Sequence, residues 1–169
     1  INADTKEKNI LFFSGAGSLN VNAIEWFIEE VFPLMLRKDS SIKLLIGGKV
    51  CQVLERFSLH GNIELKGFFD NPSDFYLLGD IVINPVSEGS GLKIKTIEAV
   101  SHGKAVVVDK HSLKGVYAPD LFPVFPVSSA EQYVDCIISL LGNETQLENI
   151  KSSCLSYIRS LNKYIDNQY

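Results

Sequence analysis

The chain has 169 residues, of which 46% are hydrophobic and 21% charged, and its formal net charge is −4. Its length suits one domain with one buried core, and its composition is that of a folded protein, which excludes a disordered one. The negative charge argues against general nucleic-acid binding, and the lack of a signal-peptide pattern or of an apolar run of roughly 18 residues leads us to expect a cytoplasmic protein.

The first half of the chain alternates apolar runs with helical patterns. Residues 9–17, NILFFSGAG, form an apolar run that ends in glycine, which predicts a buried strand and a turn. Asn22 and Glu25 resemble a capping box at the start of the helix that should follow, and Pro33 is expected to kink or shorten that helix. Helical spacing places five of its residues inward: Ile24, Phe27, Ile28, Val31 and Met35.

Three further strands and two short helices are predicted before residue 87. The strands lie within 42–48, 62–68 and 80–86, and the short helices within 50–58 and 73–79. Glycine or proline ends each strand, as expected where a buried strand meets a loop.

The second half begins with a glycine loop at 88–91. A helix from about Leu92 to His102 should follow and end at Gly103, in the position that favours a left-handed cap. Strands are predicted within 104–109 and 121–127. Ser128 and Glu131 resemble a capping box for a helix that ends near Gly142, and a last helix is expected to turn five residues inward: Leu147, Ile150, Cys154, Ile158 and Leu161.

This alternation of helices with apolar strands predicts an α/β fold. We expect a doubly wound, Rossmann-like parallel sheet of about six strands, covered by helices on both faces, in a single domain over residues 1–169. Such sheets bind ligands beyond the carboxyl ends of their strands. Three glycine-bearing turns should lie there, at 14–18, 66–70 and 87–91.

The loop at 88–91 leads into a helix whose first turn carries Lys93 and Lys95. Glycines let a ligand approach the backbone, and the free amides of a helix start attract an anion. Lysines are disfavoured at that positive end of the helix dipole, so an anion such as a phosphate is one explanation for them. The other explanation is that they are solvated, with Lys95 and Glu98 forming a surface ion pair.

Residues 84–108, NPVSEGSGLKIKTIEAVSHGKAVVV, resemble a family 4 glycosyltransferase (glycosyl transferases group 1). The resemblance is to the C-terminal nucleotide-sugar-binding half of this GT-B fold, with its proline, G-x-G, two alternating basic residues, EA, glycine and a valine run. Upstream, FFSGAGSLNVNAIEWFIEEVFPLM, LLIGG and IELKGFFDNPSDFYLLGDIVINP are also similar to that family. The similarity extends over about residues 9–142.

The resemblance implies roles for the residues of this motif. Glu98, which precedes the alanine of the EA pair, would bind the ribose hydroxyls of the donor. Loop amides and lysines would surround the diphosphate. The residues implied in this second role are Gly89, Ser90, Gly91, Lys93 and Lys95, with Lys95 as the stabiliser of the departing diphosphate.

Many family members carry another glutamate eight positions before this one, facing the donor sugar. Ser90 occupies that position here, and Glu88 lies two residues away from it. Either a longer loop brings Glu88 to the same place, or this chain does without the second carboxylate.

Two other turns match places where the family contacts its donor. Gly15 and Gly17 correspond to the first diphosphate-facing loop, although the basic residues that many members supply there are missing. Gly67 and Phe68 occupy the place where the base usually stacks. The alternatives are a tight strand-to-helix turn for the first pair and a core position for Phe68.

The histidines and cysteines carry no sign of a metal or redox site. His60, His102 and His111 lack metal-ligand spacing, and we expect His102 to be a helix-end residue. Neither a metal nor another cofactor is expected, in line with the metal-independent chemistry usual for GT-B enzymes. The three cysteines are far apart in helical patterns, so we expect them to be reduced: Cys51, Cys136 and Cys154.

The resemblance thus implies the donor-binding domain of a retaining hexosyltransferase. Because the chain starts without methionine, we expect it to be a piece of a longer protein. Its partners would be a nucleotide-sugar donor and an absent N-terminal acceptor domain, with no nucleic acid, and any peripheral membrane association would come only through that domain. A GT-B nucleotide-sugar epimerase and a non-enzymatic interaction domain are the alternatives. The base, sugar and acceptor stay open.

Overall fold

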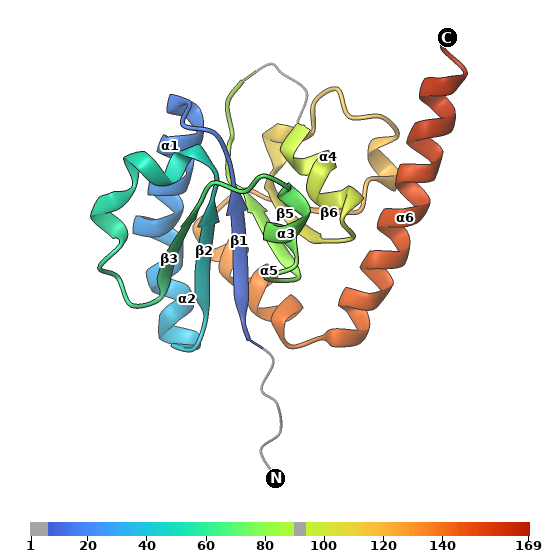
Figure 1. Ribbon diagram of the computed structural model, residues 1–169. Coiled ribbons are helices and arrows are strands. Elements are labelled where there is room, and N and C mark those ends of the chain that lie inside the picture. The colour runs from blue at the N-terminus through green and yellow to red at the C-terminus, as the bar shows by residue number, and fades with distance from the viewer. Residues whose placement is uncertain (1–6, 90–93) are drawn as a thin grey trace.

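The computed structural model describes residues 7–89 and 94–169, and its centre is one parallel sheet (Figure 1). The strand order is β3-β2-β1-β4-β5-β6. The chain builds outward from β1 in one direction and from β4 in the other, so the order reverses between these two neighbours. The prediction of a doubly wound α/β fold is confirmed. The strands are β1 (Asn9–Phe13), β2 (Lys43–Gly47), β3 (Ile63–Gly67), β4 (Ile81–Asn84), β5 (Ala105–Asp109) and β6 (Val124–Val127).

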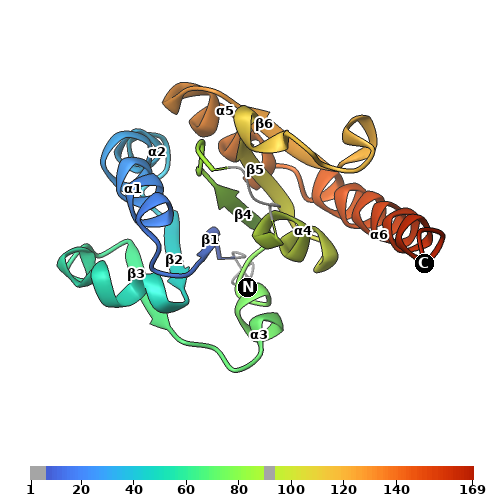
Figure 2. The same cartoon turned by 90° about the horizontal axis from the view of Figure 1, so that it is seen from above.

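Helices cover both faces of the sheet (Figure 2). One face carries α1 (Ser18–Trp26), the π-helical segment η1 (Phe27–Val31), α2 (Phe32–Lys38) and α5 (Ala130–Leu141). The other face carries α3 (Pro72–Tyr76), α4 (Ile94–Ser101) and α6 (Glu144–Asp166). With helices on both sides, the inner strands have no solvent-facing surface, which is why their sequences are apolar at nearly every position.

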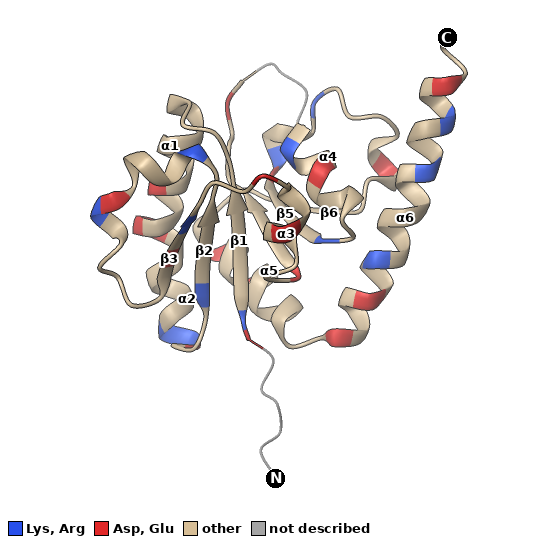
Figure 3. Cartoon of the chain, in the orientation of Figure 1, with Lys and Arg blue, Asp and Glu red and all other residues tan. Residues whose placement is uncertain are grey.

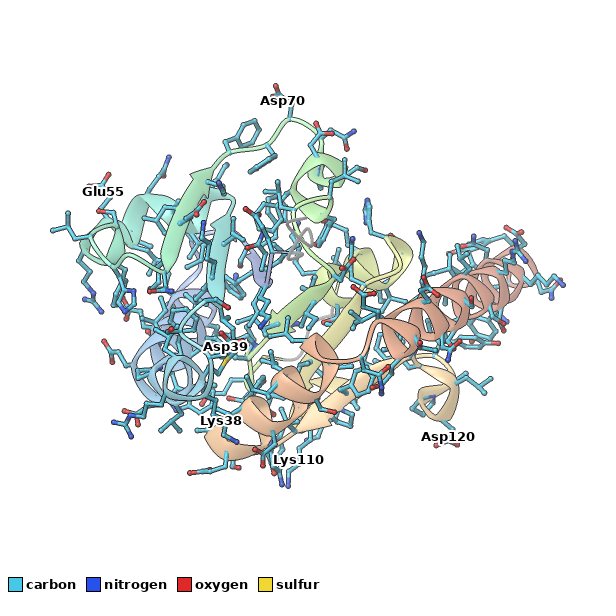
Figure 4. All side chains as sticks on the ribbon, turned by 90° about the horizontal axis from the view of Figure 1, so that it is seen from below. Lys38, Asp39, Glu55, Asp70, Lys110 and Asp120 are labelled. Atoms are coloured by element: carbon cyan, nitrogen blue, oxygen red, sulfur yellow. The ribbon has the colours of Figure 1, made fainter. Side chains whose placement is uncertain are left out.

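The core lies between the sheet and these two layers. Leu11, Ile46 and Val107 are fully buried on three different strands. Charged residues of both signs are distributed mainly over helices and loops (Figure 3). Glu55 and Asp120, for example, are exposed and point away from the body of the molecule (Figure 4).

The start of α1 differs from the predicted capping box. Gly17 is the N-cap residue and its carbonyl accepts from the N–H of Val21 at 3.0 Å, so Asn22 lies inside the helix. Glu25 instead pairs with Arg56, at 2.9 Å. The capping-box prediction was wrong because the turn after β1 is shorter than expected.

Pro33 is accommodated by a change of helix type. The N–H of Phe32 donates to the carbonyl of Phe27, five residues back, at the end of η1. Pro33 then lies in the first turn of α2, and it has no N–H to donate to the preceding turn. The helical stretch therefore continues through Pro33 by means of a π-helical turn.

Three other elements depart from or refine the predictions. Residues 50–58 form two short 3₁₀ helices, η2 (Lys49–Val53) and η3 (Glu55–Phe57), in place of one helix. The cap of α5 is Ser129, whose hydroxyl accepts from the N–H of Gln132, one residue later than predicted. Gly103 has φ +73° after α4, as its predicted left-handed cap requires. The remaining short elements are η4 (Lys110–Leu113) and η5 (Pro119–Leu121).

Helix α6 buries Ile150 and Cys154 as expected, and also Tyr157. All three cysteines are free of disulfide bonds. Within residues 7–89 and 94–169, no helix is both long enough and apolar enough to cross a membrane.

Candidate functional site

A cleft of about 450 Å³ opens at the carboxyl ends of β1 and β4, where the strand order reverses. This is the position at which doubly wound sheets bind their ligands. We call it the switch-point cleft. It is lined by residues 12–14, 17–20, 82–84, 86, 88–89 and 94–95, together with Tyr76 and Val106.

The end of β1 is held to β2 by a close backbone approach. The N–H of Ser14 donates to the carbonyl of Gly47, at 3.1 Å. Gly48 has φ +94°, and a Cβ on it would lie 2.2 Å from the Ser14 carbonyl oxygen. Only glycine fits here, and this contact fixes where the turn from β1 to α1 leaves the sheet.

Two of the three glycine-bearing turns predicted at this end of the sheet contribute residues to the cleft. Gly17 and Gly89 line it, and Gly89 has φ +107°. Gly15 is exposed in the first turn but is not among the lining residues. A Cβ on Gly15 would meet no atom within 4 Å, so close packing does not require glycine at this position.

Gly67 and Phe68 lie apart from the cleft. Gly67 ends β3 with φ +73°, and its carbonyl accepts from the N–H of Gly48 at 2.7 Å. Phe68 is 71% exposed, so the alternative of a core position is wrong. Neither residue lines the switch-point cleft, and the proposed base contact stays a prediction.

The structure describes one of the two lysines of the motif, Lys95. Ser90, Gly91 and Lys93 lie outside the described residues. Lys95 lines the cleft, with its Nζ 4.4 Å from the centre of the Phe13 ring. A cation over an aromatic face is attracted to it, so Phe13 holds the ammonium group at the cleft wall.

Glu98 lies one turn further along α4, with its side chain 22% exposed. Its Oε2 is 3.1 Å from the Nζ of Lys95, so the surface pair expected as an alternative is formed. Its Oε1 accepts from the hydroxyl of Tyr76, at 3.1 Å. Burial, and secondly the negative charge of Glu98, raise the pKa of Tyr76, so this hydroxyl stays protonated.

Tyr76 and Phe13 are the site residues that sequence reasoning missed. Phe13 is the last residue of a predicted strand, and Tyr76 belongs to a predicted short helix. The available signal was a tyrosine beside apolar residues in a helical segment, because a buried phenol usually has a hydrogen-bond partner. Its partner could not be identified, since Glu98 is 22 residues away.

His102 is the helix-end residue that the sequence predicted, and it also contacts Tyr76. The two rings stack with centroids 4.6 Å apart. His60 lies in the connection between η3 and β3, and His111 lies on η4. No group of three or more potential metal ligands occurs within the part of the chain that the structure describes.

Glu88 lies between two clefts. It lines the switch-point cleft and also a neighbouring one of about 270 Å³, which Trp26 and Asp109 help to form. Glu88 therefore borders the cleft, although it is two positions away from the place of the family's usual glutamate. Whether it contacts a donor sugar stays a prediction.

Comparison with known proteins identifies similar chains. A Klebsiella pneumoniae protein, described as an uncharacterized 44.6 kDa protein in the cps region, is 23% identical over 170 residues. That alignment covers 92% of this chain and 43% of the relative. This chain therefore spans less than half the length of that protein.

Solved structures show the same fold. The crystal structure of TarM matches with a TM-score of 0.74 and 20% identity, over 95% of this chain and 34% of that one. Anabaena Alr3699/HepE, in complex with UDP and glucose, matches with a TM-score of 0.69 and 13% identity, over 96% of this chain and 48% of that one.

A family model described as glycosyl transferases group 1 matches residues 7–143, which include every strand of the sheet and the whole of the switch-point cleft. The predicted resemblance is confirmed, and the chain belongs to the family of glycosyl transferases group 1.

Proposed function

We propose that this chain is the donor-binding domain of a retaining glycosyltransferase that uses a nucleotide-diphosphate sugar. One observation carries the proposal. Lys95 lines the cleft where the strand order reverses, and Glu98, which is not itself a lining residue, pairs with it one turn further along α4. A cation and a carboxylate at this position are the groups required for a diphosphate and for the hydroxyls of a ribose.

Lys95 and the start of α4 would act on the diphosphate. Negative charge grows on this group as the bond to the sugar breaks, and a fixed ammonium stabilises that charge more than it stabilises the ground state. The cation–π contact with Phe13 restricts the ammonium to the cleft before the donor arrives. We propose that no metal ion takes part, since Lys95 and the helix dipole supply positive charge.

The size of the cleft supports this proposal. Ligand pockets are typically about 300–1,000 Å³, and the volume here is about 450 Å³. The similar fold of HepE was solved with UDP and glucose, which makes UDP the first nucleotide to test. GDP is the second, because the described residues do not select a base.

The second wall of the cleft and the acceptor site would come from another domain. We propose that this domain precedes residue 1 in the whole protein. We also propose that the complete enzyme acts in the cytoplasm with its nucleotide sugar. The isolated chain should then bind donor weakly and transfer no sugar.

The test measures nucleotide binding by this chain. We expect UDP or GDP to raise its melting temperature, because a ligand that binds only the folded state stabilises it by about 2.7 kcal/mol at 100 times its Kd. Lys95→Ala and Glu98→Ala should each weaken the shift. No shift with either nucleotide at saturation would contradict the proposal and favour an interaction domain.

The epimerase alternative needs the whole protein. Transfer of the sugar to an acceptor, seen in products made from candidate sugar nucleotides, would support the transferase. Interconversion of the sugar nucleotide without transfer would support the epimerase.

A further inference from the structure

The hydroxyl of Tyr76 is directed at the carboxylate that the proposed function assigns to the ribose. Tyr76 is 1% exposed, yet it lines the switch-point cleft, and its hydroxyl donates to Oε1 of Glu98 at 3.1 Å. Because burial keeps the phenol protonated and an ionised carboxylate only accepts, the hydroxyl is the donor of this hydrogen bond. The contact therefore fixes one oxygen of Glu98.

Tyr76 is itself held in place by His102. The imidazole stacks on the phenol ring at 4.6 Å, with 25° between the planes. Its Nδ1 is 2.8 Å from the carbonyl oxygen of Glu98, and since a carbonyl only accepts, Nδ1 carries the proton and donates. In the neutral ring Nε2 then accepts from the hydroxyl of Ser73, 3.0 Å away. His102 thus joins α3 to α4 across the face of Tyr76.

Lys95 is a competing partner for the same carboxylate. Its Nζ lies 3.1 Å from Oε2 and 3.5 Å from Oε1 of Glu98, on a flexible side chain that is 43% exposed. A carboxylate held by this lysine alone would follow it when the lysine turns to a diphosphate. A second anchor on Oε1, from a rigid buried ring, prevents that movement.

We propose that Tyr76 is a positioning residue for the donor. It holds the Glu98 carboxylate in place between two lining residues of the cleft, Tyr76 and Lys95, so that the carboxylate accepts from ribose hydroxyls while Lys95 is released to the diphosphate. This inference rests on the proposed function. The inference extends the proposed function, because it makes ribose recognition depend on Tyr76 and diphosphate recognition independent of Tyr76.

The test is Tyr76→Phe, which removes the hydroxyl and keeps the ring that packs against His102. Titration calorimetry on the chain would use three probes: UDP, 2′,3′-dideoxy-UDP and inorganic pyrophosphate. We expect about tenfold weaker binding of UDP, as for the loss of one hydrogen bond to a charged group. Binding of pyrophosphate and of the dideoxy nucleotide should stay within about twofold, because neither engages Glu98 through a ribose diol.

Tyr133→Phe is the matched control. Tyr133 is also 1% exposed, and among the described residues its hydroxyl has no hydrogen-bond partner. It packs against Trp26 and Phe27, away from α4. This variant should bind all three probes as the unaltered chain does.

A double-mutant cycle with Glu98→Gln tests whether the effect passes through Glu98. If Tyr76 acts through this carboxylate, Tyr76→Phe should cause no further loss of UDP affinity in a chain that already carries Glu98→Gln. Additive losses would overturn the inference. An equal loss for all three probes, or unchanged UDP binding in Tyr76→Phe, would also overturn it. Failure of the unaltered chain to bind UDP, GDP and pyrophosphate would instead overturn the proposed function, and this inference with it.

Discussion

Lys95 and Glu98 form an ion pair on α4, with 3.1 Å between Nζ and Oε2. The two groups that the proposed function assigns to the diphosphate and the ribose are thus each other's partners in the unliganded chain. Donor binding would replace this single contact by two contacts with the ligand. Variants of the two residues should consequently have different effects on different ligands.

Lys95→Met should weaken binding of both UDP and pyrophosphate by about tenfold, because a charge-assisted hydrogen bond contributes about 1.5–3 kcal/mol. The free energy of unfolding should change by less than about 0.5 kcal/mol, since an exposed pair three residues apart contributes little to stability. Titration calorimetry and urea unfolding measure the two effects. Lys110→Met, at an exposed lysine on η4, is the control, and equal pyrophosphate affinity in Lys95→Met and this control would contradict the assignment of Lys95.

Glu98→Gln should separate the two ligands. UDP should bind about tenfold more weakly, because an amide is a poorer acceptor for ribose hydroxyls than a carboxylate. Pyrophosphate should bind to the variant at least as tightly as to the unaltered chain, because the Glu98 carboxylate no longer pairs with Lys95. The same calorimetric titrations test this, and a parallel loss of both affinities would mean that Glu98 does not contact the ribose.

Gly48→Ala should destabilise the chain by more than about 3 kcal/mol. The left-handed backbone alone costs about 1–3 kcal/mol, and the new Cβ would lie 2.2 Å from the carbonyl oxygen of Ser14. Gly61→Ala is the matched control, because no atom lies within 4 Å of its added Cβ. Urea unfolding of both variants measures the difference, and similar midpoints would show that the β1–β2 contact tolerates a side chain.

The thiols of Cys136 and Cys154 should be unreactive in the folded chain. Burial raises the pKa of each to about 11, so the reactive thiolate is scarce at pH 8. Burial also raises the pKa of Cys51. We expect Ellman's reagent to modify none of the three cysteines within minutes at pH 8 and all of them in concentrated urea. Rapid modification without denaturant would contradict the packing of α5 and α6.

Asp39 should contribute to acid sensitivity. Hydrogen bonds from Lys8 and then from Ser41 lower its pKa to about 2. Because the folded-state pKa lies below the unfolded value, the stabilisation is present above about pH 4 and is lost as the pH falls toward 2. Asp39→Asn should lower the melting temperature at pH 6, and its difference from the unaltered chain should shrink between pH 4 and 2. Asp120→Asn, at an exposed carboxylate on η5, is the control.

Local sequence patterns predicted the strands well and the helix starts poorly. The inner strands are mostly apolar, because a strand buried on both faces has few positions that tolerate charge, whereas the edge strand β3 carries Glu64 and Lys66. The starts of α1 and α5 were misplaced, since several polar residues near each helix could act as caps. The bond that forms, such as Ser129 with Gln132, depends on where the preceding strand leaves the sheet.

The sequence by itself determined the fold class, the family motif and the pair Lys95–Glu98, because each depends on residues that are close together in the chain. The strand order, the cleft and the placement of Tyr76 and Phe13 were decided only by the tertiary structure. Strand β4 lies beside β1, with Ile81 opposite Ile10, although about 70 residues separate them in the chain. Apolar periodicity specifies that a strand is buried, but its neighbour in the sheet is selected by the packing of both helical layers.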